Sequence, residues 1–394
     1  MPDRAAPETV EAPAAPSPVD FPDLDGPAFA FERYFLPGPV AVRPEVAAAM
    51  ARPMMGHRGQ EMKELMAGLQ PGLRALFGTG RPVYVSTSSA TGLMEAAVVN
   101  LSRRRILCLV CGAFSRRFAD IAEATGREAD TLEVPWGEAH DPDRLAERLA
   151  EAPGRYDLVT AVHSETSTGV LNPVDELAAV VAEHEDVLLA VDGVSSVAGT
   201  TVAVDEWGVD FLLTGSQKAL ALPPGLSFAA ASERALQRAA EVPARSRYFD
   251  LLEFERRIRD AQTPNTPAVP LLYALDEQLR RIAAEGLGER LERHERMAVR
   301  THRWAEGAGE RIGVELSVLA PEGRRSPTVT AVELAEGVPG AEVAAGMRDR
   351  GFTIAPGYGK LRDATVRIGH MGDHTVQELD HLLEALDEEL EGRR

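Results

Sequence analysis

The chain has 394 residues, a formal net charge of −19, and 44% hydrophobic and 26% charged residues. This composition is typical of a soluble globular protein of about two domains, and the negative charge argues against nucleic acid and anionic membrane as partners. No apolar run reaches the ~18 residues of a membrane helix, and the first residues lack the order of a secretory signal, so we expect a cytoplasmic protein.

Residues 1–30 are rich in Ala, Pro and acidic residues and have no period, which predicts a disordered acidic tail. The folded part is expected to begin near Phe31. An extended entry segment, 35–40, is followed by predicted helices over 44–51 and 61–77.

Strand and helix patterns then alternate as far as residue 231. The predicted strands are 82–86, 105–110, 128–134, 156–163, 187–192, 211–214 and 226–231, and the predicted helices are 93–101, 114–125, one after Asp141, and 174–184. Such alternation is typical of an α/β domain with a mostly parallel seven-stranded sheet covered by helices on both faces.

The last part of the chain has a different order of elements. One long helical pattern is predicted from about Pro270 to Gly307, followed by strands near 313–318, 328–334, 352–355 and 365–368 and helices near 341–350 and 375–390. We therefore expect a tail (1–30), a large domain (31–270) and a smaller α+β C-terminal domain (271–394) that begins with a long linking helix.

Neither metal nor dinucleotide binding is indicated. Cys108 and Cys111 lie in a predicted strand and are interpreted as buried thiols, because no second pair completes a zinc site. The histidines share no carboxylate spacing typical of a metal centre. The Gly-x-Gly at 78–80 precedes a strand, whereas a dinucleotide fingerprint follows one.

Polar turns follow the predicted strands, and ligands of open parallel sheets bind at that edge. Ser89, Ala90 and Thr91 lie between a predicted strand and the start of the next predicted helix, which is compatible with an anion cup or with capping alone. Glu165 lies at the base of a polar loop, where a carboxylate commonly accepts backbone donors. Asp192 ends an apolar strand, where a buried carboxylate needs a partner such as a protonated ring nitrogen.

Lys218 comes directly after the strand at 211–214 and is one of only three lysines among 42 basic residues. A lysine amine can lose its proton and add to a carbonyl, which a guanidinium does not do in proteins. By itself, this stretch is equally compatible with two interpretations: a lysine that holds an aldehyde cofactor, or a solvated lysine in a loop.

The order of these motifs resembles that of class V aminotransferases. The resemblance rests on Ser89-Ala90-Thr91, the loop 165–169, Asp192, Gly215-Ser216-Gln217-Lys218 and the stretch 367–372. Within the family the chain is most similar to the alanine–glyoxylate and serine–pyruvate aminotransferases. The match extends from Tyr34 nearly to the C-terminus, and it implies fold type I of the enzymes that use pyridoxal 5'-phosphate.

The resemblance also implies roles for single residues. Lys218 would hold the cofactor covalently and move the proton, and Asp192 would pair with its ring nitrogen. Phe114 would stack on the ring, Ser167 would bond its hydroxyl side, and Arg367 would bind the substrate carboxylate, with Gly38 beside the substrate. The phosphate would be held by Ser89, Ala90, Thr91, Gln217 and, from the partner in a homodimer, Thr263 and Thr266.

We therefore expect a transaminase that moves an amino group from alanine or serine to glyoxylate or pyruvate. Another substrate is the alternative within the fold, namely 2-aminoethylphosphonate, ureidoglycine or phosphoserine. A non-catalytic relative should have lost Lys218, Asp192 or Arg367, and all three are present.

Overall fold

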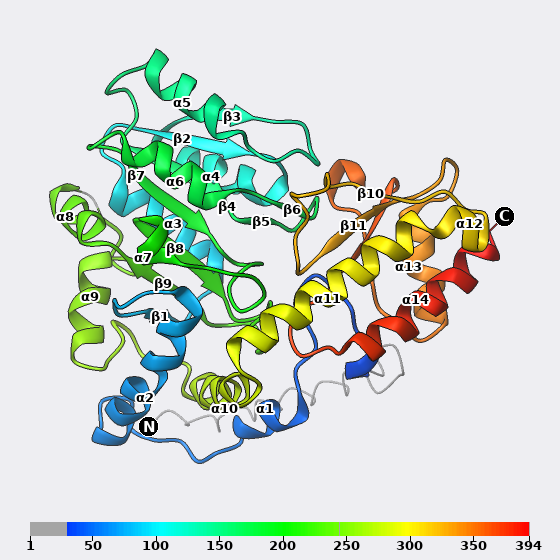
Figure 1. The fold of residues 1–394 in the computed structure, drawn as a ribbon. Helices are drawn as coiled ribbons and strands as arrows, with labels where there is room; N and C mark the ends of the chain where they lie inside the picture. Colours follow the sequence, from blue (N-terminus) through cyan, green and yellow to red (C-terminus); the bar gives the residue numbers. More distant parts are fainter. Residues whose placement is uncertain (1–29, 244, 394) are drawn as a thin grey trace, which may run out of the picture.

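The computed structural model describes residues 30–243 and 245–393. The tail predicted for residues 1–30 therefore lies, except for Ala30, outside the described residues. A first lobe contains the large sheet and a second lobe contains the C-terminal elements (Figure 1).

The first lobe is built on a seven-stranded sheet in the order β1-β9-β8-β7-β4-β2-β3. Neighbouring strands from β8 to β3 run parallel, and β9 pairs antiparallel with β1 and β8. The strands are β1 (Tyr84–Ser86), β2 (Arg105–Val110), β3 (Glu128–Glu133), β4 (Leu158–Val162), β7 (Leu188–Asp192), β8 (Phe211–Gly215) and β9 (Ser227–Ala231). The predicted α/β class with a mostly parallel seven-stranded sheet is confirmed.

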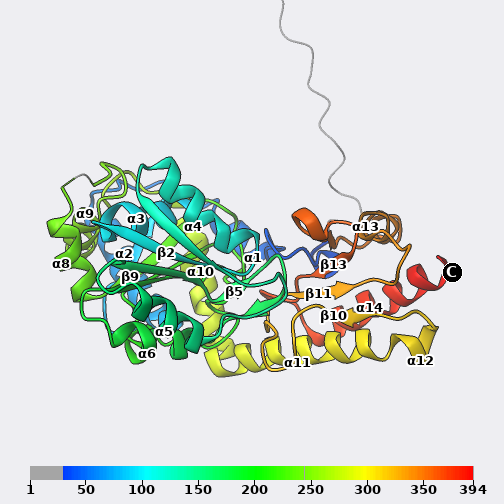
Figure 2. The same ribbon diagram turned by 90° about the horizontal axis from the view of Figure 1, so that it is seen from above.

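Helices cover both faces of this sheet, because apolar strands must be shielded from water on both sides. The view from above shows α3 (Ala90–Leu101) and α4 (Ala113–Ala124) on one side and α5 (Pro142–Glu151) and α6 (Val174–Ala182) on the other (Figure 2). The first lobe also contains α1 (Pro44–Ala49), α2 (Gln60–Phe77), the hairpin β5 (Ser164–Glu165) and β6 (Val170–Leu171), α7 (Val204–Trp207), α8 (Glu233–Glu241), α9 (Leu251–Arg259) and α10 (Val269–Glu285).

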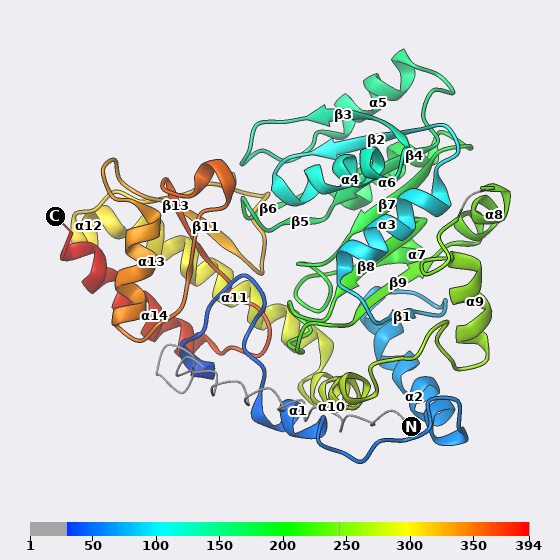
Figure 3. The same ribbon diagram turned by 180° about the vertical axis from the view of Figure 1, so that it is seen from behind.

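The second lobe has an antiparallel sheet in the order β10-β11-β13-β12. Its elements are α11 (Leu287–Glu306), α12 (Ala308–Ile312), β10 (Ser317–Val318), β11 (Thr330–Glu333), α13 (Gly340–Asp349), β12 (Ala355–Pro356), the 3-10 turn η3 (Gly359–Leu361), β13 (Thr365–Ile368) and α14 (Val376–Glu391). Its own hydrophobic core also takes in Phe35, which follows the 3-10 turn η2 (Phe31–Arg33). The N-terminal segment therefore packs with the second lobe, as the view from behind shows (Figure 3).

The helical region after residue 269 differs from the prediction. The single helix expected from Pro270 to Gly307 is two helices, because Gly286 has φ +88, outside helical geometry. The apolar side chains of α10 pack in the core of the first lobe, and Met297 and Trp304 of α11 pack in the second. The domain boundary at 270/271 stays a prediction, with the two cores meeting along α10 and α11.

The described residues contain no helix that is long and apolar enough to cross a membrane. In the same part of the chain, no group of three or more His, Cys, Asp or Glu side chains is arranged to hold a metal ion. Cys108 and Cys111 are both buried and unpaired, as expected, and burial raises the pKa of their thiols to about 11 and about 12.

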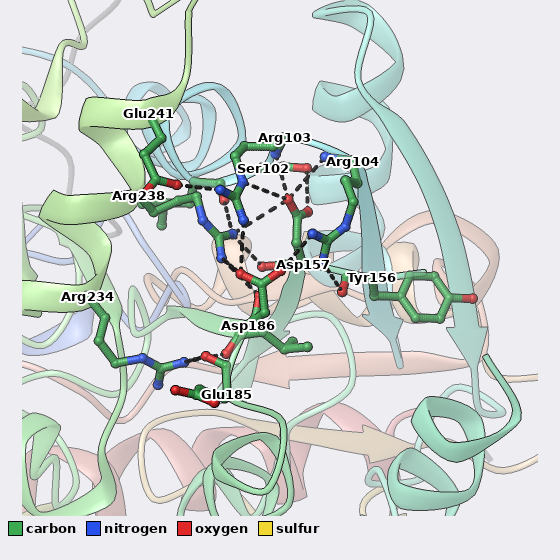
Figure 4. Close-up of polar contacts among 12 residues, drawn as sticks. Ser102, Arg103, Arg104, Tyr156, Asp157, Glu185, Asp186, Arg234, Arg238 and Glu241 are labelled. Atoms are coloured by element: carbon green, nitrogen blue, oxygen red, sulfur yellow. Dashed lines mark hydrogen bonds and ion pairs between the residues drawn. The ribbon is translucent and has the colours of Figure 1, made fainter. Parts of the chain in front are cut away.

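A buried polar network lies at the end of the sheet where β2 and β4 begin (Figure 4). The Asp157 carboxylate accepts hydrogen bonds from the backbone N–H groups of Arg103 and Arg104 at 2.8 and 3.0 Å. Arg238, only 6% exposed, lies 3.5 Å from this carboxylate and donates to the Asp157 carbonyl oxygen at 3.0 Å. This network joins α8 to the sheet far from the carboxyl ends of the strands.

Replacement of Arg238 by alanine should strongly destabilise the protein, because it removes the buried one of the two cations beside Asp157, leaving Arg103 Nε at 3.9 Å. It also removes the hydrogen bonds to the carbonyl oxygens of Leu101 and Asp157. We expect the free energy of unfolding to fall by about 3–5 kcal/mol, the usual cost of breaking a buried ion pair. Arg280→Ala is the matched control, because Arg280 is 60% exposed and its ion pairs lie at the surface. The free energy of unfolding of the Arg280→Ala protein should differ from that of the wild type by less than about 1 kcal/mol. Equal effects of the two substitutions in urea denaturation would contradict this account.

Candidate active site

A cavity of about 500 Å³ lies at the carboxyl ends of the parallel strands. Parallel strands all end at the same side of a sheet. The segments that follow β1, β2, β4, β7 and β8 therefore contribute residues to the cavity wall. The lining residues are Gly38, Pro39, Ser89, Ala90, Thr91, Met94, Phe114, Arg117, Val162, Ser164, Thr166, Asp192, Val194, Ser195, Gln217, Lys218, Pro224 and Gly225. These residues lie between positions 38 and 225 of the sequence and come together only in the folded chain. The volume of the cavity suits a small cofactor with a substrate.

Lys218 follows β8 and places its amine in this cavity. The side chain is buried, and its Nζ donates a hydrogen bond to the carbonyl oxygen of Pro37. Burial, and then the positive charge of Arg367, lowers the pKa of Lys218 to about 7. Much of the amine is therefore neutral at neutral pH, which is the form that attacks a carbonyl.

Asp192 ends β7, the strand next to β8, and lines the same cavity. Its Oδ1 accepts a hydrogen bond from the Val194 N–H at 2.7 Å, and no other donor to this carboxylate is found among the described residues. Burial raises the pKa of Asp192 to about 6. A cation in the cavity would relieve the cost of ionising this carboxylate.

The phosphate cup expected at Ser89-Ala90-Thr91 lies at one end of the cavity. Ser89 is the N-cap of α3 but makes no side-chain cap bond, and the N–H groups of Ala90 and Thr91 donate to no other described residue. A helix start with free N–H groups favours an anion. Gly215 keeps the space open, because a Cβ there would lie 2.6 Å from Gln217 Oε1.

Arg117 is a cavity residue that the sequence analysis missed. Its Nη1 donates to Thr91 Oγ1 at 3.2 Å, and its guanidinium lies 5.0 Å from the centre of the Phe114 ring. No ion pair to an acidic residue of the described chain compensates it. The signal that could have found it is helical spacing, because residues three apart on α4 share one face.

Phe114 also lines the cavity, with its ring centre 6.0 Å from Lys218 Nζ. Glu165 holds the start of α4 by accepting the N–H groups of Phe114 and Ser115 at 3.2 and 2.8 Å. The expectation that Glu165 accepts backbone donors is confirmed.

Ser167 does not reach the cavity lining, which differs from its expected role beside the ring. Its hydroxyl donates to Glu165 Oε1 at 2.6 Å and accepts from the Ala113 N–H at 3.1 Å, so it supports the same helix start. Thr166 and Ser195 line the cavity in its place, with their hydroxyl oxygens 2.6 Å apart. Thr166 and Ser167 lie in the turn between β5 and β6, where Thr166 lines the cavity and the buried Ser167 contacts Glu165.

Arg367 approaches from β13 of the second lobe. Its Nε and Nη1 donate to the backbone oxygens of Pro356 and Thr166 at 3.1 and 3.3 Å. Burial lowers the pKa of Arg367 to about 10, so it keeps its charge at neutral pH. It is not part of the cavity lining but lies close enough for its charge to lower the pKa of Lys218.

Gly38 packs directly on the Lys218 side chain. It has φ +97, and a Cβ there would lie 2.4 Å from Lys218 Cδ and 2.6 Å from Nζ. Any larger residue would displace the amine, so the structure gives Gly38 a role toward the lysine in addition to the expected one toward the substrate.

Thr263 and Thr266 do not line the cavity; together with Thr87 and Tyr248 they line a separate small depression. Thr263 Oγ1 donates to the Asn265 carbonyl oxygen at 2.7 Å, and Thr266 is exposed. Within one chain these residues do not contribute to the site.

The residues present fit the implied cofactor. The cavity holds a buried amine with a lowered pKa, a buried carboxylate with one oxygen free of described donors, an aromatic ring, and a helix start with unpaired N–H groups. Their chemistry suits an aldehyde, a basic ring nitrogen, an aromatic ring and a phosphate, respectively.

Comparisons with known proteins agree with this chemistry. The family model described as "Aminotransferase class-V" matches residues 44–359. An uncharacterized aminotransferase of Methanocaldococcus jannaschii is 38% identical over 86% of this chain and 87% of its own length.

Two solved structures are similar along nearly the whole chain. An alanine–glyoxylate aminotransferase of Nostoc sp. has a TM-score of 0.85 and 30% identity, covering 95% of this chain and 97% of its own. An aspartate aminotransferase of Thermus thermophilus has a TM-score of 0.81 and 34% identity, covering 91% and 99%.

The lowered pKa of Lys218 can be measured directly, because the chain has only three lysines. In cofactor-free protein labelled with ¹⁵N-lysine, one Nζ signal should titrate with a midpoint of about pH 7, and the amine should be neutral above it. That signal should be absent from Lys218→Ala. If no lysine titrates below pH 9 (~2 units above the expected midpoint, well outside the usual spread of such shifts), the amine is not buried as described.

Proposed function

The chain belongs to the class V aminotransferase family, and on this premise we propose that it uses pyridoxal 5'-phosphate to move an amino group from alanine or serine to glyoxylate or pyruvate. One observation carries the proposal: the buried amine of Lys218 and the buried carboxylate of Asp192 line a single cavity. The small amino acid and 2-oxo acid are supported by the Nostoc neighbour named an alanine–glyoxylate aminotransferase.

When bound, the cofactor supplies an aldehyde that takes up the amino group and a ring that accepts electrons. Each protein residue has a separate task beside it. Lys218 holds the cofactor and, once released, moves the proton at the substrate α-carbon. Asp192 keeps the ring nitrogen charged, and Arg367 binds the substrate carboxylate.

The phosphate end involves both subunits in this proposal. Ser89, Ala90, Thr91 and Gln217 would bind the phosphate from one subunit. Thr263 of the partner subunit and Thr266 of the partner subunit would complete the site. The exposure of Thr266 and its distance from the cavity of its own chain support a homodimer. The cytoplasmic location expected from the sequence stays a prediction.

A dicarboxylic amino donor such as aspartate is the second candidate. Arg117 lines the cavity and has no acidic partner in the described chain, so it could bind a second carboxylate. The Thermus thermophilus neighbour is named an aspartate aminotransferase. A panel of amino acids in single-turnover reactions, followed by cofactor absorbance, separates the two candidates.

Replacement of Lys218 by alanine should abolish transamination and the yellow colour of the loaded protein. Proton transfer alone accounts for about 10²–10⁴-fold in rate, and loss of covalent attachment adds to it. The matched control is Lys360→Ala, because Lys360 is exposed and lies over the Trp136 ring. An active and normally coloured Lys218→Ala protein would remove the proposal.

Asp192→Asn tests the carboxylate at nearly constant volume. We expect kcat to fall by about 10²–10³-fold, the order seen when one electrostatic group is lost from an active site. The variant should still bind the cofactor, because Lys218 and the phosphate end are intact. A kcat within about twofold of wild type would show that the Asp192 charge has no part in the reaction.

A further inference from the structure

Tyr358 is an exposed aromatic residue that the activity described so far does not use. Its side chain is 39% exposed, and it is one of three large hydrophobic residues with this much exposure in the described chain. It lies in the connection between β12 and β13, the antiparallel pair in which Arg367 faces Ala355. Tyr358 and Arg367 therefore belong to the same hairpin.

The turn that carries Tyr358 has little freedom. A Cβ on Gly357 would lie 1.9 Å from the Leu361 carbonyl oxygen, and Gly359 has φ +54, which favours glycine. The Leu361 N–H donates to the Tyr358 carbonyl oxygen at 3.0 Å. The tyrosine is thus presented at a fixed position in spite of its exposure.

The Tyr358 ring lies between the two lobes. It lies 5.3 Å from the Arg367 guanidinium carbon and 5.2 Å from the centre of the Phe114 ring, which lines the cavity. The Arg367 guanidinium has a second link to the first lobe through its bond to the Thr166 carbonyl oxygen. The Arg367 guanidinium carbon therefore lies over the Tyr358 ring, at the point where the second lobe meets the cavity.

The remaining edge of Arg367 is open. Its Nε and Nη1 donate to backbone oxygens, whereas its Nη2 donates to no described residue. Two backbone hydrogen bonds and the contact with the Tyr358 ring restrict the orientation of the guanidinium. The free Nη2 is the donor available to a carboxylate.

We propose that Tyr358 is a positioning residue that orients Arg367 for the carboxylate of the amino acid and forms the outer wall of the substrate space. This inference rests on the proposed function. It assigns recognition of the substrate carboxylate to a pair of residues, an arginine and the tyrosine ring on its face. It does not involve Tyr358 in holding the cofactor.

The test uses two ligands that differ in the carboxylate. 2-Methylalanine has a carboxylate but no α-hydrogen, so it binds without being turned over, and isopropylamine lacks the carboxylate. With full-length protein loaded with cofactor, Tyr358→Leu should weaken 2-methylalanine about 3- to 30-fold, the range of a partly shielded cation–π contact. Isopropylamine affinity and the apparent Kd of the cofactor should not change.

Three further variants make the result specific. Tyr358→Phe keeps the ring and should bind 2-methylalanine within about twofold of wild type, because the ring face provides the interaction. Lys360→Ala alters the same exposed turn and should have no effect. In an Arg367→Ala background, Tyr358→Leu should cause no further loss, since two residues that act through one contact are not additive.

Equal affinities of wild type and Tyr358→Leu for 2-methylalanine would overturn the inference, as would equal weakening of both ligands. A wild-type protein that binds 2-methylalanine but transfers no amino group from any amino acid would contradict the proposed function alone.

Discussion

The structure depends on the burial of one amine and one carboxylate at the carboxyl ends of neighbouring parallel strands. Burial disfavours the charged form of each group, which is why the pKa of Lys218 falls to about 7 and that of Asp192 rises to about 6. A protein that needed only stability would avoid such a pair. The register of β7 against β8, with Asp192 opposite Leu213, brings the turn that carries Lys218 to the same edge as the acid. The sheet therefore creates a site in which an amine can act as a nucleophile at neutral pH.

The second lobe completes this site from the other side. The N-terminal segment links the two parts: Phe35 packs in the core of the second lobe, and the Pro37 carbonyl oxygen accepts a hydrogen bond from Lys218 Nζ. Arg367 reaches back to Thr166 in the first lobe. The cavity chemistry therefore depends on how the two lobes sit together.

Much of the fold and of the candidate site could be predicted from the sequence. Apolar runs of four to six residues that alternate with helical patterns gave the strands, and polar residues after each strand gave Ser89, Asp192 and Lys218. Effects that depend on backbone geometry or on side-chain direction were harder to predict. Periodicity alone does not show that Gly286 breaks a helix, nor that Thr166 faces the cavity while Ser167 faces Glu165. Tyr358 gave no signal of its own, because its neighbours Phe114 and Arg367 come together only in the folded chain. Arg117 could have been found only from its helical spacing to Phe114.

The most direct test of the central claim is the identity of the residue that holds the cofactor. The protein should be incubated with pyridoxal 5'-phosphate, reduced with borohydride, digested, and analysed by mass spectrometry. With only three lysines in the chain, assignment of the reduced adduct is unambiguous. The account predicts one cofactor-derived adduct, on the peptide that contains Lys218. An adduct on Lys63 or Lys360 with Lys218 unmodified, or no adduct on any lysine, would contradict it.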